Sequence, residues 1–160
     1  IVLINIIILI IESLTQEYID LGYTPFLSDL SKESVYIDLG FANGRRSIEA
    51  LPSILTGMPS LLSKPLYQSS FQTNYFKSLP QSLKENGYHT SFFHGGKTGT
   101  MDFDAYTKSI GINEYYGKED YQLVSWLVFL DFLLVEESPC FGEGRWFFFY
   151  ARISKESCSD

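Results

Sequence analysis

The distribution of apolar residues along the chain predicts alternating strands and helices. Residues 1–11 are almost all Ile, Val and Leu, with Asn5 as the polar break. A short β-branched run of this kind is typical of a strand buried on both faces of a parallel sheet. Residues 35–41 and 88–93 are the next two segments with strand character, and 145–150 could form a last buried strand. The pattern predicts a largely parallel sheet.

Helical periodicity fills the intervals between these segments. The apolar stripe that runs from Ile48 to Met58 has helical spacing, and Pro52 inside it predicts a kink or a late start. Thr24 can cap a helix that opens with Pro25, and residues 79–86 and 102–110 predict two more helices, each stopped by a glycine. Residues 60–77 lack periodicity and predict a long loop. The expected fold is α/β, with a mostly parallel sheet flanked by helices.

Charge and composition narrow the class of protein. The formal net charge is -7, which argues against sequence-independent binding to the phosphate backbone of nucleic acid. The apolar opening run is shorter than a membrane span needs, and no targeting segment is recognisable in this chain. Residues 121–150 hold ten aromatics and only five charged residues, without a clean period. This change in composition predicts a boundary near residue 120.

Three positions carry candidate chemistry. Glu12 stands where the first strand should leave the sheet, so it suits either a hard cation or the backbone donors of a helix start. Ser47 follows Arg45 and Arg46 at the expected start of a helix, which fits either a nucleophile beside an anion or an ordinary cap with solvated arginines. His94 is expected to be exposed at the same sheet edge. It could be a metal ligand, a general acid, a substrate contact or a histidine hydrogen-bonded to a loop.

Taken together, these stretches resemble the sulfatase-like branch of the alkaline phosphatase superfamily, most closely phosphoglycerol transferases of the lipoteichoic-acid-synthase type. The resemblance covers residues 1–120 and rests on four segments in order. These are the strand ending in ESL at 12–14, TPFL at 24–27, FANG at 41–44 through Ser47 to LTG at 55–57, and GYHT at 87–90 through FHGG at 93–96 to Phe103 and Asp104.

The resemblance implies a metal-dependent phosphoryl or sulfuryl ester hydrolase or phosphoglycerol-type transferase. Ser47 precedes Thr-Gly by the family's intervals and corresponds to the nucleophile and a metal ligand. Glu12 corresponds to the first metal ligand, and Arg46 and His94 to substrate contacts. One divalent ion (Mn, Mg, Ca or Zn) and a small-molecule or lipid-linked phosphate or sulfate ester are implied.

The comparison with the family pattern also shows where this chain differs from it, and it implies a cellular location for the parent protein. A second alignment places Arg45 at the nucleophile position, which would make the protein inactive. The family's downstream Asp-His pair is not recognisable, so the alternative is a non-catalytic fragment or degenerate homologue. We expect residues 1–120 to be the N-terminal part of an incomplete catalytic domain, inactive as an isolated chain. Residues 121–160 are expected to be divergent, truncated or frame-shifted. The parent protein is expected to be membrane-anchored, on the extracytoplasmic face of a bacterial cytoplasmic membrane.

Overall fold

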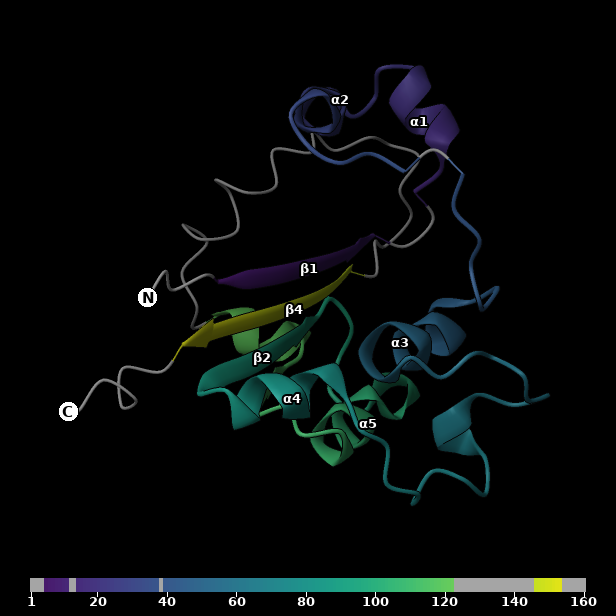
Figure 1. The fold of residues 1–160 in the computed structure, drawn as a ribbon, viewed down its shortest axis with the longest axis vertical. Coiled ribbons are helices and arrows are strands. Elements are labelled where there is room, and N and C mark those ends of the chain that lie inside the picture. The colour runs from purple at the N-terminus through teal and green to yellow at the C-terminus, as the bar shows by residue number, and fades with distance from the viewer. Residues whose placement is uncertain (1–4, 12–13, 38, 123–145, 154–160) are drawn as a thin grey trace.

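The computed structural model describes residues 5–11, 14–37, 39–122 and 146–153. Its strands are β1 (Ile6–Ile11), β2 (Tyr88–His94), β3 (Glu114–Tyr116) and β4 (Trp146–Ile153). Its α-helices are α1 (Gln16–Asp20), α2 (Pro25–Lys32), α3 (Ser47–Thr56), α4 (Leu79–Glu85) and α5 (Phe103–Ser109). Three 3-10 turns complete the order, η1 (Leu66–Gln68), η2 (Thr100–Asp102) and η3 (Lys118–Gln122). This alternation confirms the predicted α/β class (Figure 1).

The described strands form one sheet in the order β1-β4-β2-β3. β2 pairs with β3 in parallel, and β4 pairs with both β1 and β2 in antiparallel fashion. It follows that β1, β2 and β3 share one direction and that β4 runs against them. Sequence patterning predicted the segments that form β1 and β2 as strands of a largely parallel sheet, but it predicted neither β3 nor the reversed direction of β4.

The strand register brings the carboxyl ends of β1 and β2 to the same edge of the sheet. Phe147 of β4 is opposite Ile10 on one side and His94 on the other. Strands in a sheet are about 4.8 Å apart, so the ends of β1 and β2 are separated by roughly two such spacings. Ligands of α/β proteins bind at this kind of edge.

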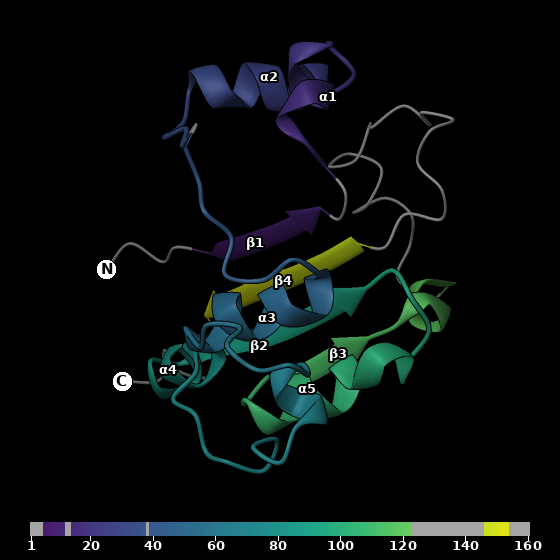
Figure 2. The same cartoon turned by 90° about the vertical axis from the view of Figure 1, so that its right-hand side faces the viewer.

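The core lies on the side of β2 that carries Phe92 and is filled from α3 and α5. Apart from Phe92, its buried residues are Leu51, Leu55, Tyr67, Phe103, Tyr106, Ile110 and Ile112. Leu83 of α4 packs against the same cluster. Among the described helices, α3, α4 and α5 therefore share one face of the sheet, and α3 lies across it with its first turn toward the edge where β1 and β2 end (Figure 2).

The helix boundaries follow the local sequence. α3 runs from Ser47 through Pro52 to Thr56, and Gly57 ends it in the left-handed conformation with φ 68°. Ser78 caps α4 by accepting the backbone N–H of Gln81 at 3.0 Å. The predicted helices at 79–86 and 102–110 are confirmed, with the second one beginning as η2 and continuing as α5.

The α1–α2 pair lies apart from the sheet, on the β1 side in both views (Figures 1 and 2). Neither helix contains a buried residue. Pro25 opens α2 as predicted, but the hydroxyl of Thr24 makes no capping hydrogen bond.

The predicted strand at 35–41 is wrong. None of its described residues lies in a strand, and the side chains of Val35 and Phe41 are almost fully exposed. Strand propensity becomes a strand only where a neighbouring strand supplies backbone partners, and none does so here among the described residues.

Candidate functional site

The first turn of α3 presents the residues singled out from the sequence. Arg46 is the N-cap, with extended backbone angles and no side-chain cap, and Ser47 is the first helical residue. The first N–H groups of a helix lack partners within it and carry the positive end of its dipole. Ser47 is half-buried. A hydroxyl at this position is well placed beside an anion.

Glu49 holds this turn together. Its carboxylate accepts the backbone N–H of Arg45 at 3.0 Å and the Nε of Arg46 at 2.9 Å. A second nitrogen of the Arg46 guanidinium pairs with the same oxygen. The hydrogen bond from Arg46, followed by the one from the Arg45 backbone, lowers the pKa of Glu49 below its usual 4.5. Glu49 therefore stays ionised at neutral pH. It pairs with the guanidinium of Arg46, which the family resemblance implied to be a substrate contact.

Gly44 is required by the closeness of the backbone to Glu49. A Cβ placed on Gly44 would lie 2.6 Å from the Cβ of Glu49, closer than real Cβ atoms come, and 3.1 Å from its carbonyl carbon. The structure gives close approach as the reason.

His94 ends β2 at the predicted sheet edge, but the expectation that it is exposed is wrong. Its side chain is fully buried, its Nδ1 lies 3.0 Å from the hydroxyl of Tyr115, and its ring meets Phe103 edge-on at 5.1 Å. A Cβ on Gly96 would lie 2.7 Å from the Cε1 of His94, so the glycine loop lies directly on the imidazole. The role of His94 in substrate binding stays a prediction.

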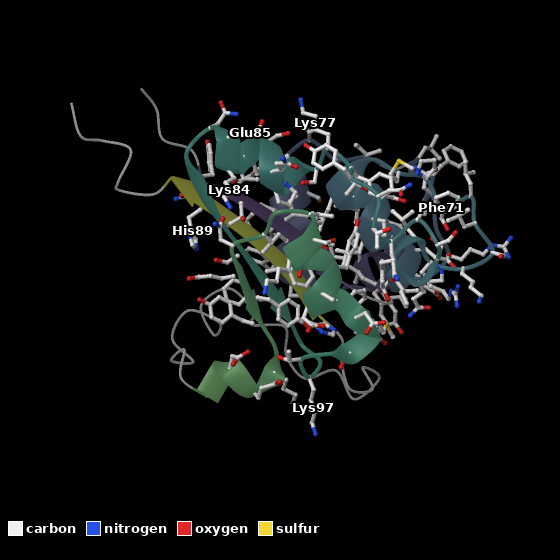
Figure 3. The ribbon with its side chains drawn as sticks, turned by 90° about the horizontal axis from the view of Figure 1, so that it is seen from below. Phe71, Lys77, Lys84, Glu85, His89 and Lys97 are labelled. Atoms are coloured by element: carbon white, nitrogen blue, oxygen red, sulfur yellow. The ribbon has the colours of Figure 1, made fainter. Side chains whose placement is uncertain are left out.

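Two cavities, each of about 290 Å³, adjoin the start of α3. The polar cavity is lined by Asn43, Gly44, Arg45 and neighbouring residues, and the apolar cavity by the loop that follows α3. Phe71 lies on that loop, on the side of the molecule away from His89 (Figure 3). Of the arginines before α3, it is Arg45 rather than Arg46 that lines a cavity, and Ser47 lines neither.

The metal site cannot be assembled from the described residues. Glu12 lies outside them, and within them no three His, Cys, Asp or Glu side chains come together. Ser47 would contribute a single oxygen. The described part of the chain thus does not supply the donor set that a divalent cation needs.

Sequence reasoning missed Glu49 and Tyr115. Glu49 stands three residues after the N-cap, the position at which a glutamate reaches back to the start of a helix, so the capping pattern could have revealed it. The contact between Tyr115 and His94 joins β2 to β3, and no local pattern announces it.

A second polar cluster lies on the β2–β3 pair. Glu114 accepts from Tyr116 at 2.7 Å and pairs with His89 at 3.1 Å, and its pKa is lowered by these two hydrogen bonds in that order. Ser91 reaches the same oxygen at 3.3 Å. The carboxylate is the shared acceptor in this cluster, so His89 is not positioned to activate the Ser91 hydroxyl.

Comparison with known proteins gives one family. The family model described as Sulfatase matches residues 4–134, most of the chain and past the boundary predicted at residue 120. No solved structure matches the chain. Among the described residues, no helix combines the length and the apolar character that crossing a membrane requires. The chain belongs to the sulfatase family, whose members act on sulfate and phosphate esters and generally use a divalent metal ion.

Proposed function

We propose that this chain carries the nucleophile half of a phosphoryl or sulfuryl ester hydrolase or transferase, with Ser47 as the nucleophile. The observation that supports it is the position of Ser47 as the first residue of α3, a helix of ten residues with its first turn toward the carboxyl edge of the sheet (Figure 2). The helix dipole and the N–H groups of the first turn favour the charge that develops on an ester during attack.

The chemistry assigned to Ser47 is a displacement in two steps. Its Oγ attacks phosphorus or sulfur, the Ser47 hydroxyl loses its proton, and the ester oxygen leaves as an alcohol after taking up a proton. Water or an acceptor alcohol then attacks the covalent Ser47 ester, the bond to the Ser47 Oγ breaks, and the proton of the attacking hydroxyl returns to the serine as phosphate, sulfate or the transferred group is released. Arg46 would stabilise the negative charge on the non-bridging oxygens once its guanidinium leaves its ion pair with Glu49.

A divalent ion of the kind the family uses would act as a Lewis acid and favour the ionised serine. We propose Glu12 and Ser47 as two of its ligands, although the described residues do not complete a site. His94 would contribute on the substrate side only if the loop at Gly96 moved, because the imidazole is buried beneath it.

The second candidate function is a non-catalytic member of the family. It is favoured by the lining of the polar cavity, where Arg45 is present and Ser47 is absent. If the family's nucleophile position corresponds to Arg45, no covalent ester can form there, since a guanidinium is permanently protonated and not nucleophilic. We also propose that the isolated chain is inactive for lack of further ligands.

The closer relationship to lipoteichoic-acid synthases also belongs to the proposal, and its support is the FANG-to-LTG segment around α3. With it we propose a lipid-linked or small-molecule ester as substrate. The parent protein would be anchored at the extracytoplasmic face of a bacterial membrane.

Hydrolysis of a chromogenic phosphodiester and of a chromogenic sulfate ester, each with and without Mn²⁺, tests the proposal. The proteins are the chain, Ser47→Ala and the control Ser34→Ala, whose hydroxyl is exposed and bonded to the Leu30 carbonyl at the end of α2. Turnover lost only in Ser47→Ala supports the nucleophile. Turnover that survives in Ser47→Ala refutes it. No turnover in any of the three proteins supports the proposed inactivity of the isolated chain.

A further inference from the structure

The two cavities beside α3 are neighbours with opposite chemical character. They share three lining residues, Glu49, Ser60 and Leu62, so the two cavities adjoin along these side chains. One side of the shared wall is polar and the other is apolar. A ligand that spans both must combine a charged or polar group with an apolar one.

The polar cavity suits an anionic head group. Arg45 lines it with a permanent positive charge, and Asn43 and Ser60 can donate hydrogen bonds to oxygen atoms. Glu49 also lines it, but its carboxylate is compensated by the Arg45 N–H and the Arg46 guanidinium. The charge balance of the cavity therefore favours a phosphate or sulfate group.

The apolar cavity has a wall of aliphatic and aromatic side chains. Met58, Leu62, Leu66, Phe71 and Phe76 line it, with Lys64 and Asn74 among its few polar residues. Phe71 and Leu62 are each more than two-fifths exposed, so apolar surface is open to solvent here. Covering such surface with an apolar group is favourable, whereas a polyol placed there would lose hydrogen bonds to water without replacement.

The volume of the apolar cavity suits a compact apolar group. About 290 Å³ lies at the lower end of the range of roughly 300–1,000 Å³ for small-molecule sites. A single ring system or a short branched chain fits that volume. Phe71 and Phe76 offer ring faces and edges to an aromatic group.

We infer that the paired cavities bind a phosphate or sulfate ester of a compact apolar alcohol, with the ester in the polar cavity and the alcohol portion in the apolar one. This inference rests on the proposed function for the nature of the ester. It adds the class of alcohol, and it selects against polyol esters.

Calorimetric measurement of ligand binding to the whole chain tests the inference. The probes are 1-naphthyl phosphate, 1-naphthyl sulfate, glycerol phosphate and inorganic phosphate. We expect 1-naphthyl phosphate to bind roughly tenfold more tightly than inorganic phosphate or glycerol phosphate, since one well-packed ring contributes about that factor. The naphthyl sulfate arm separates sulfate from phosphate preference.

Phe71→Ser and Tyr75→Ser form a matched pair on one loop. Phe71 lines the apolar cavity, whereas Tyr75 is a highly exposed aromatic residue outside the lining set. Phe71→Ser should abolish the naphthyl preference and Tyr75→Ser should leave it intact. Arg45→Ala should weaken all the anionic probes together.

Three results would overturn the inference: equal affinity for naphthyl and inorganic phosphate, a preference unchanged by Phe71→Ser, or no binding of any probe. Its failure is distinguishable from that of the proposed function. A naphthyl preference that persists in Ser47→Ala without turnover supports the inference alone. Turnover that depends on Ser47 without a naphthyl preference supports the proposed function alone.

Discussion

The imidazole of His94 and the hydroxyl of Tyr115 lie 3.0 Å apart and join the carboxyl end of β2 to β3. The backbone at Gly96 closes over the same imidazole. The end of the strand, its neighbour and the following loop are thus fixed to one another through a single buried ring. This arrangement sets the shape of the sheet edge that faces the candidate site.

Gly96→Ala should destabilise the fold. The added methyl would lie 2.7 Å from His94 Cε1, and a fully buried ring cannot withdraw without disturbing its neighbours. Overpacking of this kind costs about 1–3 kcal/mol. Urea unfolding measures it, with Gly40→Ala as the control because nothing lies within 4 Å of a Cβ there. Equal stability of the two variants would contradict the close packing.

Substitutions of Tyr67 should separate its ring from its hydroxyl. The ring stacks on Tyr106 at 4.7 Å and anchors the loop after α3, while the buried hydroxyl has no hydrogen-bond partner among the described residues. Tyr67→Ala should cost about 3–5 kcal/mol. Tyr67→Phe should be neutral or stabilising, because it removes an unpaired polar group. Unfolding midpoints compare them, and a large loss in Tyr67→Phe would show that the hydroxyl is bonded in solution.

Stability should fall in alkaline solution through the buried tyrosines. Burial raises the pKa of Tyr106 from 10.0 to about 12, and burial also raises that of Tyr67. Above pH 10 the unfolded chain releases protons that the folded chain retains, so the free energy of unfolding decreases as pH rises from 10 to 12. One such group gives a slope of up to about 1.4 kcal/mol per pH unit.

Thermal melts between pH 9 and 12 measure this loss. Tyr106→Phe should flatten the profile relative to the unaltered chain, because it removes one of the two raised groups. An unchanged profile in that variant would mean that folding does not raise the pKa of Tyr106.

The ion pair at α3 should appear in the titration of Glu49. Hydrogen bonds from Arg46 and from the Arg45 backbone hold its pKa below 4.5. Arg46→Ala removes the first-named cause, so the pKa should rise toward 4.5 and the signal should shift at higher pH. Carbonyl NMR of the labelled chain follows the titration. A pKa unaffected by the substitution would show that Arg46 is solvated rather than paired.

The elements that sequence reasoning predicted well are those with local signals. Gly87 and Gly111 end their helices in the left-handed conformation that their neighbours led us to expect, and Pro25 opens α2. Local patterns failed where the partner is distant. The β-prone residues at 35–41 have no strand beside them, and the burial of His94 depends on Gly96 and on Tyr115.

The candidate site was predictable to a similar degree. Ser47 and Arg46 stand at a helix start, as their place before the apolar stripe indicated. The i,i+3 spacing of Arg46 and Glu49 is a local signal for their ion pair, whereas the lining of the cavity by Arg45 arises from how a loop folds back on a helix. Spacing along the chain carries no record of that geometry.

The place of β4 in the sheet determines when the sheet can form during synthesis. Among the described strands β1 pairs only with β4, and Ile8 is opposite Phe149, about 140 residues later in the chain. At roughly 5–20 residues per second, an uncharged run of isoleucine and leucine waits on the order of 10 s for its first partner strand. β1 is therefore translated well before β4, and its unpaired backbone is exposed to chaperones and to aggregation in that interval.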